Sequence, residues 1–260
     1  MKKLFYLVIG LGLLAQACNK NTSGDTGKLS EANEMLKKGE IGTFEIPGAD
    51  GLDVTVDYYP NDTARAIIIL CHQAGYSRGE YREIAPKLMH KGYACIAVDQ
   101  RSGKVSYGIE NETAKRAVEM GLPDKYMDAR ADIEAVVDYV ANNTEKKIYL
   151  WGSSYSASLA LLIGKQDARV KKVIAFSPGE YLDNQTTVRR ETAGINKPVF
   201  ITGSNLEYDL IVKQIVEVLP SEYITAHKPD GVSDHGSKTL NMPSTTSDVT
   251  YAKLFDFLRK

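Results

Sequence analysis

Short apolar runs alternate with longer amphipathic segments along most of this chain, and this alternation limits the folds that it can adopt. "RAIIILC", "YACIAVD" and "VKKVIAFS" are near-continuous apolar runs, as expected for strands buried on both faces of a sheet. Segments with helical spacing lie between such runs, for example residues 126–143. The order predicts right-handed βαβ crossovers, and hence a mostly parallel sheet with helices on both faces in a three-layer α/β/α fold.

Two further segments near the start alternate apolar and polar residues. "IGTFEIPG" and "LDVTVDYYP" are separated by a Gly-Ala-Asp-Gly turn, which predicts an N-terminal antiparallel hairpin. With 43% apolar content, the chain of 260 residues can bury one good core. We therefore expect one domain over residues 41–260.

The first residues have the pattern of an export signal. Two lysines precede an apolar stretch from Leu4 to Ala15, which is shorter than the roughly 20 residues that span a bilayer. We expect a signal peptide over 1–17. Cys18 follows "LLAQA", which resembles the lipobox of bacterial lipoproteins; ordinary cleavage nearby is the alternative. The polar residues that follow predict a solvated tether over 18–40, in an exported periplasmic or outer-membrane lipoprotein of a Gram-negative-type bacterium.

The charge and cysteine content exclude several kinds of partner. Lys and Arg total 32 against 33 for Asp and Glu, which gives no reason to expect binding to nucleic acid. Membrane contact is expected only through the N-terminal lipid. Cys71 and Cys95 lie in or beside apolar runs and are expected to be buried thiols, with a disulfide or a redox pair as the alternative. No spacing of Cys and His suggests a metal site.

One serine-rich stretch has the context of a catalytic turn. The frame from Gly152 to Ser156 follows a predicted strand and opens a predicted helix, as a G-x-S-x-G nucleophile elbow requires. Only Ser154 occupies the nucleophile position, and Ser156 replaces the second glycine. The alternative is a serine-rich helix cap, because Ser153 or Ser154 could serve as an N-cap.

Several motifs in order carry a resemblance to a known family. "LCHQAGYSRGEYREIAPKLMHKGYACIAVDQRSGK" precedes the elbow, and "FSPG", "KPVFITG" and "SDHGSKTL" follow it. In this order the chain resembles the α/β-hydrolases, specifically the dienelactone hydrolase-like branch, over nearly all of its length after the tether. The resemblance implies a serine esterase that cleaves a small-molecule ester through an acyl-enzyme, with no metal or organic cofactor.

The resemblance also implies a base and an acid. In this fold the order is Ser, acid, His, which points to His235 in the loop before the last helix, with His227 as the alternative. Glu207 follows "VFITG" at about the distance that the acid of the family occupies. Asp209 is the alternative acid, although it can also begin the next helix.

The oxyanion hole is expected to use backbone N–H groups. One would come from Tyr155 and the other from Ala74 or Gln73, where the family usually has glycine at the latter position. His72 is expected to shape this loop and the substrate pocket. His90 lies at a predicted helix end, where a cation suits the helix dipole.

An insertion at residues 102–127 begins at the carboxyl edge of the sheet and predicts either a small cap over the acyl site or a surface helix. The short connection between "FSPG" and "KPVFITG" leaves no room for a large lid, so an open site for small or polar-ended esters is expected. Peptidases and acyltransferases use the same constellation. The alternative from another class is a catalytically silent, membrane-tethered binding protein.

Overall fold

The structure, a computed structural model, describes residues 22–183 and 187–260. The predicted signal peptide over 1–17 and Cys18 lie outside the described residues. Among the helices that are described, none is long and apolar enough to cross a membrane.

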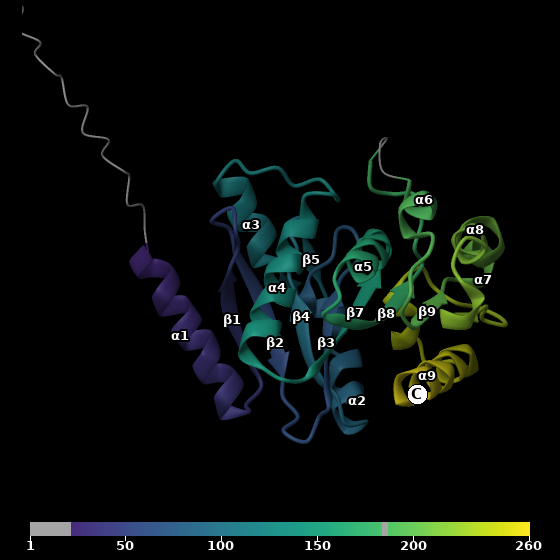
Figure 1. Cartoon of the computed structure of the whole chain (residues 1–260), viewed down its shortest axis with the longest axis horizontal. Helices are drawn as coiled ribbons and strands as arrows, with labels where there is room; N and C mark the ends of the chain where they lie inside the picture. The colour runs from purple at the N-terminus through teal and green to yellow at the C-terminus, as the bar shows by residue number, and fades with distance from the viewer. Residues whose placement is uncertain (1–21, 184–186) are drawn as a thin grey trace, which may run out of the picture.

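An eight-stranded sheet with the order β1-β2-β4-β3-β7-β8-β9-β10 forms the centre of the fold (Figure 1). β1 pairs with β2 and β2 with β4 in antiparallel fashion, and every other neighbouring pair is parallel. The predicted N-terminal hairpin and mostly parallel sheet are therefore confirmed. The strands are β1 (Gly42–Pro47), β2 (Asp53–Tyr59), β3 (Ala66–Cys71), β4 (Ala94–Val98), β7 (Lys147–Ser153), β8 (Val170–Phe176), β9 (Val199–Thr202) and β10 (Ile224–His227).

The register of the central strands brings their carboxyl ends to one edge. Cys71 at the end of β3 pairs with Gly152 of β7, and Ser153 pairs with Phe176 at the end of β8. Phe176 in turn pairs with Thr202 at the end of β9. The loops that follow these strands therefore converge, which is where ligand sites form in parallel sheets.

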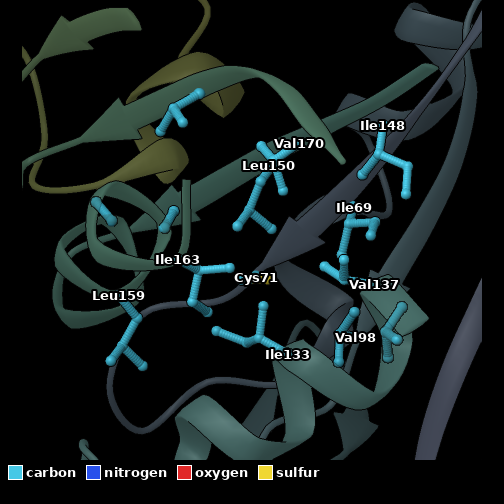
Figure 2. Close-up of a cluster of buried hydrophobic side chains, with 14 of the residues drawn as sticks. Ile69, Cys71, Val98, Ile133, Val137, Ile148, Leu150, Leu159, Ile163 and Val170 are labelled. Carbon is cyan, nitrogen blue, oxygen red and sulfur yellow. The ribbon is translucent and has the colours of Figure 1, made fainter. Parts of the chain in front are cut away.

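Helices cover both faces of the sheet, and alternate residues of each strand divide the core between them. In β3, Ile67 and Ile69 face one cluster, while Ile68 and Leu70 face the other. Helices α4 and α5 close the first cluster (Figure 2), and α2 and α9 close the second. The main helices are α2 (Ile84–His90), α4 (Ala129–Asn143), α5 (Tyr155–Gln166), α6 (Val188–Thr192), α7 (Asn205–Glu207), α8 (Lys213–Val216) and α9 (Thr245–Arg259).

The two described cysteines are free and buried, as expected. Cys71 belongs to the first core cluster and Cys95 to the second, so their side chains lie on opposite faces of the sheet. Burial raises the pKa of both thiols. A thiolate is the reactive form, so both cysteines are inert space-filling residues in the folded protein.

The predicted solvated tether over 18–40 is wrong where the structure describes it. Residues Thr22–Lys38 form helix α1, which lies beside β1 (Figure 1). Ala32 is fully buried, Met35 packs against the first core cluster, and Lys28 forms an ion pair with Glu45 at 2.6 Å. The periodic placement of these side chains gives an otherwise polar segment one face that packs on the domain.

Two of the helices are preceded by irregular helical turns. The 3-10 turn η1 (Arg78–Tyr81) lies just before α2. A π-helical turn, η2 (Tyr208–Val212), leads directly into α8.

The insertion at 102–127 contains the short strands β5 (Val105–Ser106) and β6 (Ile109–Glu110) and helix α3 (Glu112–Glu119). It is fixed to the loop after β3. Ser77 Oγ lies 2.8 Å from Ser106 Oγ and donates to the carbonyl of Ile109 at 2.8 Å, and a Cβ on Gly79 would lie 2.3 Å from the carbonyl oxygen of Ser106. This close approach requires glycine and sets the insertion beside the edge where the strands end.

Candidate active site

Ser154 occupies a strained turn between β7 and α5. Its φ of 60° and ψ of −123° lie in a region that residues other than glycine rarely adopt. A Cβ on Gly152 would lie 2.1 Å from the carbonyl oxygen of Ser156, so strand and helix approach too closely for any side chain there. The backbone N–H of Ser154 donates to Phe176 O at 2.8 Å. This is the geometry of a nucleophile elbow.

Ser156, which replaces the second glycine of the motif, joins the elbow to the end of β3. Its Oγ lies 2.7 Å from the carbonyl oxygen of Cys71 and 2.8 Å from that of His72. It also accepts the backbone N–H of Ser153 at 3.0 Å. Glycine could make none of these hydrogen bonds, so the serine stabilises the turn.

A hydrogen-bonded chain connects Ser154 to a histidine and a carboxylate. His235 Nε2 lies 2.7 Å from Ser154 Oγ, and His235 Nδ1 hydrogen-bonds Glu207 Oε1. A carboxylate only accepts, so Nδ1 carries the proton and Nε2 is free to accept from the serine. The three side chains come from β7–α5, the loop before η4 (Ser237–Asn241) and helix α7.

The surroundings of Glu207 keep it ionised. Burial alone would raise its pKa, but the hydrogen bond and charge of His235 oppose this, with help from Ser204 N–H and Ser177 Oγ. The net effect lowers the pKa of Glu207 from 4.5 to about 2. Glu207 is therefore an anion at neutral pH, as a residue that orients an imidazole must be.

The alternative residues lie elsewhere. Asp209 is exposed and pairs with Lys228 at 2.5 Å. His227 at the end of β10 lies 3.1 Å from Thr250 Oγ1, and the ring of His90 hydrogen-bonds the carbonyl of Pro86 in α2 at 2.7 Å. None of these side chains reaches Ser154 or His235, so the structure brings together the first choices for base and acid rather than the alternatives.

The structure distinguishes between Gln73 and Ala74, the two candidate donors to the oxyanion that the sequence left open. The N–H of Gln73 donates to Glu80 Oε2 at 2.8 Å, so the prediction of Gln73 as an oxyanion donor is wrong. In the described part of the chain, the N–H groups of Ala74 and Tyr155 donate to no protein acceptor. Tyr155 is also the first residue of α5, where the helix dipole favours negative charge.

His72, which was expected to line the substrate pocket, is fully buried beneath the loop and lines no cavity beside Ala74. Its Nδ1 lies 2.8 Å from the carbonyl of Gln73, and its Nε2 accepts from the backbone N–H of Gln100 at 3.0 Å. Burial lowers the pKa of His72 to about 4. It is a neutral structural residue that fixes the loop bearing Ala74.

Glu80 is a residue of the site that the sequence did not reveal. Its side chain is fully buried, and its Oε1 accepts from Ser153 Oγ at 2.7 Å. Burial raises the pKa of Glu80 to about 7, against the opposing effects of the hydrogen bonds from Gln73 and Ser153. An acidic residue in the first turn of a helix usually faces solvent and complements the dipole, so its position in the sequence gave no signal.

A cavity of about 880 Å³ lies beside the loop that follows β3 and carries Ala74 (the oxyanion loop). Ala74 and Gly75 form one side of it, and residues of the insertion form most of the remainder. Tyr126, which also lines it, stacks on Tyr155 with ring centroids 4.5 Å apart. Through this ring contact, a residue of the cavity wall touches the residue that follows Ser154.

The family model described as "Serine aminopeptidase, S33" matches residues 62–212, which is more than half of the chain. The chain belongs to this family. Its members are serine hydrolases with the α/β-hydrolase fold, so the predicted fold and enzyme class are confirmed. The matched segment includes the loop after β3, the elbow and the candidate acid, and it ends before His235. No curated protein sequence matches the chain significantly.

Solved structures of similar fold include hydrolases. An esterase of Pyrococcus furiosus superposes with a TM-score of 0.66 at 18% identity, over 85% of this chain and 93% of that one. A dienelactone hydrolase from Anabaena variabilis gives a TM-score of 0.62 at 14% identity, over 83% of this chain and 96% of that one. At these identities the similarity establishes the fold.

The lowered pKa of Glu207 predicts an acid dependence of stability. A group whose folded pKa lies at about 2 rather than 4.5 stabilises the fold above pH 4.5, and this contribution is lost as the pH falls toward 2. The free energy of unfolding, measured in urea, should therefore fall more steeply with acidification in wild type than in Glu207→Gln. Asp209→Asn, which removes an exposed carboxylate two residues away, should keep the wild-type slope. Equal slopes in wild type and Glu207→Gln would contradict the assigned ionisation.

Proposed function

We propose that the protein is a carboxylesterase-type serine hydrolase that cleaves a small ester through an acyl-enzyme. The observation that carries this proposal is the hydrogen-bonded chain from Ser154 through His235 to Glu207 at a strained elbow. In the proposal Ser154 is the nucleophile, His235 the general base and Glu207 the orienting acid, while Ala74 and Tyr155 donate to the oxyanion. A silent binding protein has less support, because it would not need a strained serine within reach of a base.

In the first half of the reaction, Ser154 Oγ attacks the ester carbonyl while His235 Nε2 takes its proton. The carbonyl oxygen becomes an oxyanion that accepts from the N–H groups of Ala74 and Tyr155. Collapse breaks the bond to the alkoxide, which leaves with the proton from His235. In the second half, water gives a proton to His235 and attacks the acyl-Ser154 ester. Collapse breaks the bond to Ser154 Oγ, which takes the proton from His235, and the carboxylic acid is released.

The cavity beside the oxyanion loop supports an apolar acyl group in the substrate. Val105, Val118 and Tyr126 line it and are exposed by 57%, 68% and 37% respectively. An ester docked with its carbonyl at the oxyanion donors could direct its acyl chain along this wall. The insertion at 102–127 would then serve as the predicted small cap over the acyl site. Within the described residues, the connection between β8 and β9 holds the five-residue helix α6, which is too short to be a lid domain.

Export remains part of the proposal and rests on the sequence alone. The apolar run from Leu4 to Ala15 and the cysteine that follows it support a lipid-anchored enzyme on the outside of the inner membrane or in the outer membrane. Such an enzyme would meet its esters in the periplasm.

A fluorophosphonate probe, which reacts with activated serines, tests the nucleophile and the base. Ser154→Ala should lose all labelling, and His235→Ala should be labelled about 10³-fold more slowly, because the hydroxyl loses its base. His227→Ala is the matched control and should be labelled at the wild-type rate. Labelling that persists in Ser154→Ala, or that disappears in His227→Ala, would contradict the assignment.

Esters of increasing acyl length test the pocket. We expect p-nitrophenyl octanoate to be hydrolysed with a higher kcat/KM than the acetate. Val118→Asp should lower kcat/KM about ten-fold for the octanoate and little for the acetate, because the charge opposes burial of the chain. Val249→Asp, the same substitution at an exposed valine of α9 that does not line this cavity, should change neither. An equal effect of both variants would show that the acyl chain lies elsewhere.

A further inference from the structure

One buried carboxylate lies at the junction of the segments that carry the candidate catalytic groups. Glu80 belongs to η1, outside all of those segments, and its side chain has no exposure to solvent. A buried charge is costly unless it is fully hydrogen-bonded, so its retention there needs a reason. The partners of Glu80 supply one.

The Glu80 carboxylate accepts its hydrogen bonds from residues that directly precede candidate catalytic residues in the sequence. Its Oε2 accepts from the backbone N–H of Gln73, which precedes Ala74. Its Oε1 accepts from Ser153 Oγ, which precedes Ser154. The donor–acceptor distances are 2.8 Å and 2.7 Å. One carboxylate therefore joins the oxyanion loop to the nucleophile elbow.

The same network extends to the loop that carries the base. Ser153 Oγ accepts from the backbone N–H of Ser237 at 2.8 Å, two residues after His235. Since this N–H occupies the acceptor side of the hydroxyl, the hydroxyl proton is directed to Glu80. A Cβ on Gly236 would lie 2.5 Å from Ser153 Oγ, so the loop that carries His235 packs directly against this hydroxyl. The loop that carries Ala74, the elbow and the loop that carries His235 are thus joined in one hydrogen-bond network through Ser153 Oγ and Glu80.

The carboxylate is chemically matched to this position. Three donors converge on its two oxygens: the backbone N–H and the side-chain Nε2 of Gln73, the latter at 3.4 Å, and Ser153 Oγ. An ionised carboxylate is an acceptor at both oxygens, whereas an amide would turn an N–H₂ group toward one of these donors. The positive charges of His235, when protonated, and of Lys238 also favour the ionised form, against the burial that disfavours it. An anion here would further stabilise the imidazolium that forms during catalysis.

We propose that Glu80 is a positioning residue that holds the Ala74 amide, Ser154 and His235 in register for the reaction. This inference rests on the proposed serine hydrolase function. Glu80 touches neither substrate nor reacting atoms; it acts through Gln73, Ser153 and Ser237. Its loss should therefore impair the chemical step more than substrate binding, since a displacement of about 1 Å in such groups can cost about 10²-fold in rate.

Steady-state kinetics with a p-nitrophenyl ester test the proposal in the full domain. In Glu80→Gln we expect kcat to fall about ten-fold or more with KM within about two-fold of wild type. Glu80→Asp retains an anionic acceptor and should recover part of the loss. Ile96→Val, a core substitution in β4 at a side chain outside the hydrogen-bond network, is the control for lost stability and should leave kcat unchanged. The midpoint of urea unfolding is measured for each variant.

A double-mutant cycle separates positioning from general destabilisation. Ser153→Ala removes the hydroxyl between Glu80 and Ser237, so it should lower kcat by a similar factor. If the two residues act through one network, Glu80→Gln and Ser153→Ala combined should cost little more than the larger single effect. Fully additive losses, an unchanged kcat in Glu80→Gln, or equal activity of Glu80→Asp and Glu80→Gln would overturn the proposal.

Failure of the underlying function has a different signature. If Ser154→Ala retained wild-type turnover, the serine hydrolase proposal would fail and the role of Glu80 would fail with it. If turnover required Ser154 but Glu80→Gln retained full kcat, the positioning role alone would be wrong.

Discussion

The close approach of β7 and α5 at the elbow is the constraint on which the rest of the site depends. With no room for a side chain at Gly152, the chain must turn within one residue, and Ser154 takes a φ of 60°. Local contacts compensate this strain: the Ser154 N–H donates to Phe176 O, and Ser156 Oγ fastens the turn to the carbonyl groups at the end of β3. The parallel register then brings the loops that carry Glu207 and His235 to the turn.

Two carboxylates near this turn show how environment separates their roles. Glu207 shares its oxygens with His235, Ser177 and Ser204, and these interactions lower its pKa to about 2 despite partial burial. Glu80 is fully buried, and desolvation raises its pKa to about 7 despite the hydrogen bonds from Gln73 and Ser153. The first is suited to hold a histidine and its developing charge. The second is suited to tie backbone segments together.

Periodicity in the sequence was enough to predict the sheet, the hairpin and the strand-to-helix context of Ser154, because these follow from local patterns. His235 and Glu207 came from the order of motifs in a resemblance. Whether Glu207 or Asp209 lies beside the histidine, and whether Gln73 or Ala74 offers its amide, depends on tertiary contacts without a local signature. The same holds for Glu80. Helix α1 was misjudged because its apolar face is narrow in a mostly polar segment.

The central claim is that Ser154 carries an acyl group during turnover, and pre-steady-state hydrolysis of p-nitrophenyl octanoate tests it most directly. The account predicts a burst of p-nitrophenol that approaches one per enzyme molecule when deacylation is the slower step. Acid quenching during the burst should then give an octanoyl mass increment on the peptide that contains Ser154. A mass increment on another residue, or turnover without any acylated enzyme under conditions in which acylation outpaces deacylation, would contradict the account.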